Sequence, residues 1–252
     1  MLCYGPGRNV GRGRRASGVG RITRFFAITV CSDVRKVKRL AWVVACLALL
    51  ASSGTASPQA SPPVAQITFT KTLKGSIPEF MTLTVDAKGA ATYDSHKLDE
   101  AGSPRPLQVS ADTTARIFAL AESLHFFRGI ELETHRKVAN MGLKTLAYEA
   151  GGETGRVQFN YTENHTAQQL ADLLERIGNV EEQISQLEYE MKYDHLGLPE
   201  VLRQVEIGMA EHSYVEAVLM VPTLEKISSN PHYMHLAQSR AQEIMQQIRE
   251  GK

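Results

Sequence analysis

A helical pattern followed directly by a hairpin pattern spans residues 107–161, and it constrains the fold more than any other stretch. Ser110 can cap a helix whose apolar residues recur every three or four positions, and Gly129 offers a left-handed stop. Strand-like runs at 141–148 and 156–161 flank a glycine-rich turn. Neither a lone helix nor a lone hairpin is stable in water, so we expect the helix to cover a sheet that contains this hairpin. The apolar stripe consists of Ile117, Leu120, Ala121 and Leu124, widened by Phe118 and Phe127.

Residues 66–106 supply the remaining strands. Ile67, Phe69 and Lys71 alternate with threonines over 67–72, and Leu83 and Val85 alternate with threonines in the run 80–85, which predicts two strands. Residues 86–89 form a turn that ends in glycine, and 91–93 can return as a third strand. The polar segment 94–106 is expected to be a surface loop.

A second helix is predicted after Asn164, a suitable cap, and Gly178-Asn179 either kinks or ends it. The expected order over 66–177 is β-β-β-α-β-β-α. This order favours an α+β fold, a mainly antiparallel sheet with helices packed on one face.

An all-α extension is expected over residues 178–252. Pro199 in a first turn, Ser213 as a cap, Pro222 as a break and Asn230-Pro231 as a start divide it into three or four short helices. They resemble helical-repeat hairpins, but they are too few for a solenoid.

The N-terminal region predicts export. A basic segment precedes a twelve-residue apolar run at 40–51, and small residues precede Ser57, so 34–56 is typical of a cleavable signal peptide. Twelve apolar residues are too short to span a bilayer, so we expect no stable membrane span after cleavage. Residues 1–33 are expected to be disordered and to represent an over-extended start, and 57–65 to be a proline-rich linker. The protein is therefore expected to be periplasmic or secreted.

The charge is unevenly placed along the chain. Residues 1–56 hold ten of the 28 Lys and Arg residues and one acidic residue, which leaves 18 basic and 26 acidic residues from Ser57 onward, a balance of −8. This balance argues against nucleic acid as a partner. All three cysteines precede residue 47, so the mature body would have no disulfide and no thiolate chemistry.

No catalytic or metal motif is recognisable. Of the eight histidines only His232 and His235 could share a helix face, which is too few for a metal site, and two solvated histidines are the simpler interpretation. Acid pairs at 131/133 and 181/182 could serve a hydrolase, but a solvated surface explains them better. We therefore predict no metal, no cofactor and no assigned catalytic residue.

A basic cluster enters the predicted hairpin. Arg136, Lys137, Asn140 and Lys144, with His135 beside them, could bind an acidic ligand or an acidic partner protein. The alternative, which we prefer because surface ion pairs are common and weak, is that these cations pair with the nearby Glu131, Glu133 and Glu149.

The opening strands carry a resemblance to a known family. The segment Gly75-Ser76-Ile77-Pro78-Glu79-Phe80, followed by alternating residues at 82–85 and Gly89, resembles the opening hairpin of a family of uncharacterised exported bacterial domains. The resemblance covers 66–177 and implies the same helix–hairpin–helix order. Ile77 stands where that family usually has cysteine, so no cysteine-based role is carried over. The family has no established activity to transfer.

Export, the basic cluster and the appended helices favour a non-catalytic binding or protein-interaction module. The alternative is a hydrolase of unrecognised type that uses carboxylate or histidine chemistry.

Because a signal normally begins a chain, we expect translation to start near Val34 or Val37. Mass spectrometry of the unprocessed precursor should find no peptides from residues 1–33. Peptides that contain Met1 would contradict this expectation.

Overall fold

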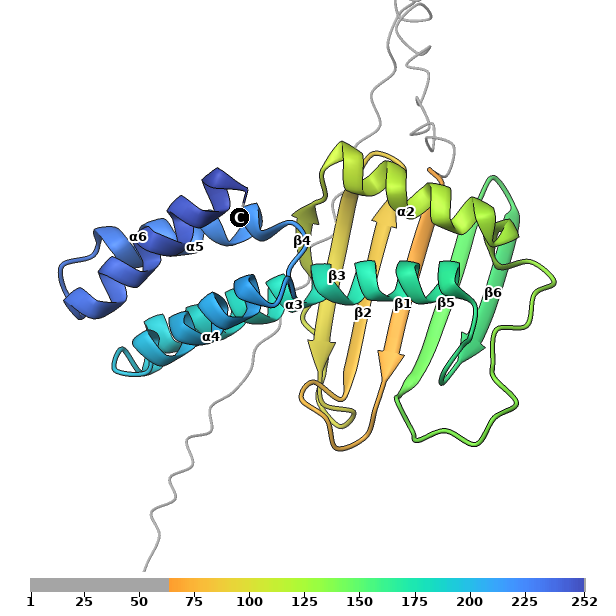
Figure 1. The fold of residues 1–252 in the computed structure, drawn as a ribbon, viewed down its shortest axis with the longest axis horizontal. Coiled ribbons are helices and arrows are strands. Elements are labelled where there is room, and N and C mark those ends of the chain that lie inside the picture. The colour runs from red at the N-terminus through yellow and green to blue at the C-terminus, as the bar shows by residue number, and fades with distance from the viewer. Residues whose placement is uncertain (1–63, 252) are drawn as a thin grey trace, which may run out of the picture. The chain divides into compact units, whose positions relative to one another are not determined.

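The computed structural model describes residues 64–251, which belong to one compact unit (Figure 1). The predicted N-terminal tail at 1–33, the signal peptide at 34–56 and nearly all of the linker at 57–65 lie outside the described residues. The α+β sheet and the C-terminal helices lie within them.

The predicted α+β class is confirmed. A six-stranded sheet has the order β4-β3-β2-β1-β5-β6, and all neighbouring strands are antiparallel. The strands are β1 (Gln66–Thr72), β2 (Phe80–Asp86), β3 (Ala90–His96), β4 (Arg105–Gln108), β5 (Leu143–Ala150) and β6 (Glu153–Phe159).

Two helices cover one face of this sheet, as Figure 1 shows. The first, α2, carries the chain across the strands from the β4 edge to the β5–β6 side, and α3 returns across the same face. The helices are α2 (Ala111–Ser123), α3 (His165–Tyr193), α4 (Leu198–Ala210), α5 (Val221–Ser229) and α6 (His235–Glu250), with 3₁₀ turns η1 (His125–Phe127) and η2 (Ala217–Met220).

Alternation along the strands separates a core face from a hydroxyl face. Ile67 and Phe69 of β1 are fully buried beneath the helices. Thr68 and Thr70, between and beyond them, point to the other face, where their hydroxyls lie 3.1 and 3.3 Å from those of register partners on β2. The period of two predicted for these strands therefore assigns the face of each side chain correctly.

Helix α3 continues through Gly178, so of the two predicted alternatives, a kink or an end at that position, the end is wrong. A Cβ atom at Gly178 would lie 2.6 Å from Met81 Cε and 3.1 Å from Tyr93 Cε2. The missing side chain thus permits close approach of the helix to β2 and β3 rather than ending it.

The buried apolar side chains form two clusters that share α3. Ile177 belongs to the cluster between the sheet, α2 and the first half of α3, whereas Val180 belongs to a second cluster with α4, α5 and α6. Since both clusters include residues of one continuous helix, that helix joins the sheet to the C-terminal helices.

The expected loop over 94–106 is partly wrong. Strand β3 extends to His96, and Arg105–Gln108 forms the edge strand β4, paired with β3. This strand is short and contains Pro106, which edge positions tolerate because one side of the strand needs no ladder partner. No apolar alternation marked it in the sequence.

The first helix begins as predicted but ends earlier. Ser110 Oγ accepts a hydrogen bond from the Thr113 N–H, and the helix ends with Leu124 as its C-cap rather than at Gly129. His125, Phe126 and Phe127 then adopt positive φ values of 53°, 51° and 64°. Burial of the Phe127 ring offsets the cost of this unusual backbone.

The hairpin turn is shorter than predicted. Gly151 and Gly152 alone connect β5 to β6, with φ values of 55° and 92°, so the strands extend to Ala150 and begin again at Glu153. Positive φ at both turn positions suits the right-handed twist of the paired strands. The remaining residues of the expected turn therefore join the ladder.

The C-terminal region is helical as predicted, with different starts. Pro199 and Pro222 lie in the first turns of α4 and α5. Ser213 caps no helix, since the next helical turn, η2, begins only at Ala217 and has Glu216 as its N-cap. Helix α6 begins at His235 rather than at Asn230-Pro231.

We predict that Leu124→Ala destabilises the protein by about 2–5 kcal/mol, because Leu124 is buried and its loss leaves a cavity. Arg116→Ala, at an exposed position of the same helix, should change stability by less than about 0.5 kcal/mol. Urea unfolding of both variants measures the contrast. Similar small losses would show that α2 does not organise the core.

Candidate functional site

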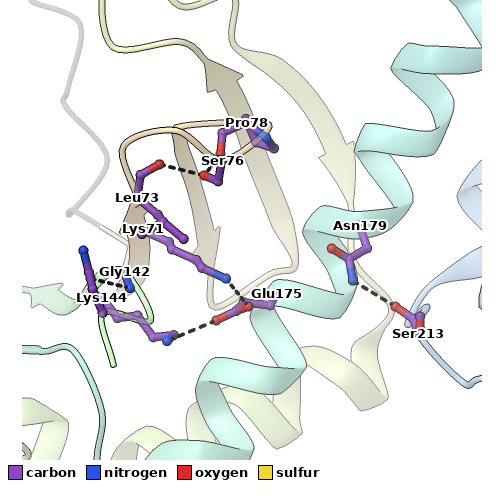
Figure 2. Close-up of polar contacts among 10 residues, drawn as sticks. Lys71, Leu73, Ser76, Pro78, Gly142, Lys144, Glu175, Asn179 and Ser213 are labelled. Carbon is purple, nitrogen blue, oxygen red and sulfur yellow. Dashed lines mark hydrogen bonds and ion pairs between the residues drawn. The ribbon is translucent and has the colours of Figure 1, made fainter. Parts of the chain in front are cut away.

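Two lysines lie side by side on the core face of the sheet, near one end of the neighbouring strands β1 and β5. Lys71 of β1 and Lys144 of β5 are direct register partners. They occupy the next inward positions after Phe69 and Leu146, which are also partners and are fully buried. The lysine pair thus continues a core row, and both side chains extend toward α3 (Figure 2).

Glu175 of α3 lies between the two ammonium groups, as Figure 2 shows. Its carboxylate is 2.7 Å from Lys71 Nζ and 3.9 Å from Lys144 Nζ. Like charges placed opposite each other on neighbouring strands repel, and one carboxylate neutralises only one of them. Lys71 therefore holds the close ion pair, and Lys144 keeps hydrogen-bond donors for another acceptor.

Lys144 is the more buried of the two lysines, so its charge depends more strongly on the groups around it. Its side chain is 13% exposed, against 26% for Lys71. Desolvation lowers the pKa of Lys144, Glu175 raises it and Lys71 lowers it further. A partly desolvated ammonium group is stabilised by any anion that approaches it.

Glu175 lies on the wall of two pockets. One, of about 250 Å³, has Lys144 on its wall. It lies between the open end of the β5–β6 hairpin, where β5 begins and β6 ends, and the first turns of α3. The other, of about 140 Å³, has Lys71 and Tyr93 on its wall. We define the lysine site as Lys71, Lys144 and Glu175 together with the larger pocket.

A second polar cluster fixes the continuation of α3 against β3 and β4. The Tyr93 hydroxyl donates to Glu182 at 2.8 Å, and Arg105 lies 3.7 Å from Glu181 and 3.0 Å from Glu188. Burial raises the pKa of Glu181, and burial with the neighbouring Glu182 raises that of Tyr93. These groups satisfy one another, which indicates a role in holding the helix.

The predicted basic residues divide between the site and the surface. Only Lys144 reaches the lysine site; Arg136 pairs with Glu163 at 3.0 Å, and both side chains are exposed. Lys137 is exposed on the same loop. The Asn140 carboxamide oxygen accepts the Gly142 N–H at 3.0 Å, which shapes the entry into β5.

His135 and the glutamates expected to neutralise the cluster have different neighbours. His135 lies 4.0 Å from Glu131, whereas Glu133 accepts the Asn160 N–H and Glu149 accepts from the Gln66 amide. Surface pairing thus accounts for His135 and, through Glu163, for Arg136, whereas Lys144 lies near Glu175 of α3 instead.

The sequence patterns did not single out Lys71 or Glu175. Lys71 shares the inward parity of Ile67 and Phe69, so a lysine at the third core position of β1 was the available signal. Glu175 follows the fully buried Leu174, and no local pattern shows that it reaches a strand about a hundred residues earlier.

Metal ligands do not gather in the part of the chain that the structure describes. Within residues 64–251, no three His, Cys, Asp or Glu side chains lie close enough to hold an ion. His232 precedes α6 and His235 begins it, so the two histidines do not share a helix face as the sequence suggested.

The sequence matches no protein-family model, and no curated protein shows significant similarity to it. The resemblance of residues 66–177 to exported bacterial domains stays a prediction.

We expect Glu175→Gln to lower the pKa of Lys144, because Glu175 is the group that raises it. NMR titration of the lysine Cε–Hε resonances measures this shift, with the exposed Lys226 as an internal reference. A Lys144 pKa that stays constant would show that the 3.9 Å contact carries no electrostatic interaction.

Proposed function

We propose that this protein is an exported, non-catalytic binding module whose lysine site receives the acidic group of a ligand or partner protein. One observation carries the proposal: Lys71 and Lys144 share the single carboxylate of Glu175. Lys144 has the longer of the two contacts with this carboxylate, and its side chain also lines a pocket. An incoming carboxylate would complete the neutralisation. Such charge-assisted hydrogen bonds are stronger than neutral ones.

Exposed apolar side chains support an interaction role as well. Tyr189 and Tyr193 of α3 contact each other at 5.0 Å between ring centroids, and both are more than half exposed. Leu196, in the turn after α3, is 77% exposed. Aromatic side chains are enriched at protein–protein interfaces relative to the rest of the surface.

Location outside the cytoplasm follows from the predicted signal peptide at 34–56 and belongs to the proposal. Among the helices of residues 64–251, none combines the length and the apolar character needed to cross a bilayer.

A hydrolase is the alternative, and the described carboxylates support it less. Glu181 pairs with Arg105, Glu182 accepts from Tyr93, and Glu133 accepts a backbone N–H. Acid–base catalysis by paired carboxylates depends on two groups at one cavity whose environments push their pKa values apart. The shared carboxylate of the lysine site is better suited to binding.

Hexaglutamate tests the binding function, with hexaglutamine as the neutral probe. We expect saturable binding of hexaglutamate to the full chain in calorimetry, at least about tenfold tighter than hexaglutamine, since a charge-assisted hydrogen bond contributes about 1.5–3 kcal/mol. Lys144→Met should weaken this binding about tenfold.

Lys226→Met is the matched control, because it removes an exposed lysine from α5 and should leave binding unchanged. Equal affinity for both peptides, or full binding by a folded Lys144→Met variant, would refute the proposal. Turnover of ester or glycoside substrates by the purified chain would favour the hydrolase instead.

A further inference from the structure

The walls of the larger pocket are mostly apolar. Met141 is 51% exposed at the mouth, Phe159 and Ala171 are buried beside it, and Tyr161 lies at the surface. These side chains line the same pocket as Lys144. A bound molecule would therefore lie against hydrocarbon and ring surfaces while its polar end meets the ammonium group.

The amide side chains on the pocket wall already have partners. Asn160 donates to the Ala139 carbonyl and accepts the Met141 N–H, and the Gln168 amide donates to the Thr162 carbonyl. Within residues 64–251 no hydrogen bond engages the Tyr161 hydroxyl. Lys144 and Tyr161 thus offer donors for a ligand. A ligand that bound the amide group of Asn160 or Gln168 instead would have to break the hydrogen bonds that these groups already make.

The charges at the mouth limit the number of acidic groups. Asp172 and Glu175 both lie on the pocket wall, where Asp172 pairs with Arg176 at 3.7 Å and Glu175 with Lys71. Lys71, Lys144 and Arg176 thus give three cations for the two carboxylates. One further carboxylate is neutralised, whereas a second one inside the pocket would meet Asp172 and Glu175.

We infer that the pocket binds a small monocarboxylate with an apolar body, its carboxylate on Lys144 and its hydrocarbon or ring against Met141, Phe159 and Tyr161. This inference rests on the proposed function and specifies its ligand class. A volume of about 250 Å³ suits a ligand smaller than most drugs, such as a single ring or a short chain that carries one acid.

Phenylacetate is the probe, and three relatives separate its parts. Phenylacetamide keeps the ring without the charge, acetate keeps the charge without the ring, and phenylmalonate adds a second carboxylate. In NMR titrations of the full chain we expect phenylacetate to bind about tenfold more tightly than each of the three, with the largest shifts at Lys144 and Tyr161.

Two variants assign the contacts. Lys144→Met should weaken phenylacetate about tenfold and leave phenylacetamide unchanged, because it removes the charge and keeps the hydrocarbon stem. Met141→Ala should weaken phenylacetate about threefold and hexaglutamate by less, because the ring of phenylacetate loses more apolar contact than a glutamate side chain does. Met234→Ala removes a similarly exposed methionine from the C-terminal region, 46% exposed, and should change neither.

The outcomes distinguish the two proposals. If hexaglutamate still binds through Lys144 while phenylacetate binds no better than acetate or phenylmalonate, the ligand class is wrong and the binding function stands. Equal binding of phenylacetamide would also overturn the ligand class. If Lys144→Met affects neither probe, both proposals fail.

Discussion

The close contact of α3 with the sheet determines where the other parts of the structure lie. Gly178 lets the helix approach Met81 and Tyr93 closely, and no larger residue would fit there without displacing one of them. Because Glu175 precedes this contact by one turn, the same approach brings its carboxylate to the lysine pair. The second half of the helix then provides one wall of the C-terminal cluster.

The electrostatics of the site follow from this placement. Two lysines at core-facing positions would be costly without an anion, and one carboxylate supplied by α3 stabilises them unequally. The excess cation lies at a pocket rather than in the interior, so solvent or a ligand can neutralise it. A fold that required only stability could bury an apolar residue in place of Lys144, which is why we connect this residue with binding.

Local rules predicted much of this fold. The caps at Ser110 and Asn164, the alternation in β1 and β2, and the glycine turn were all recognisable, because each depends on neighbours within a few residues. The edge strand β4 was missed because pairing with β3, not its own pattern, makes it a strand. The site was predicted only in part, for a related reason. Lys144 was named from a local cluster of basic residues, but its partners Lys71 and Glu175 are distant in sequence and meet it only through sheet register and helix packing.

The central claim is that Lys144 is the less committed cation of the pair. Two double-mutant cycles measured by urea unfolding, one with Lys71→Met and Glu175→Gln and one with Lys144→Met and Glu175→Gln, test it directly. We predict a clear favourable coupling between Lys71 and Glu175, and a markedly smaller one between Lys144 and Glu175, because the second contact is longer. A coupling for Lys144 equal to or larger than that for Lys71 would contradict the account, because Glu175 would then already satisfy the cation assigned to the ligand.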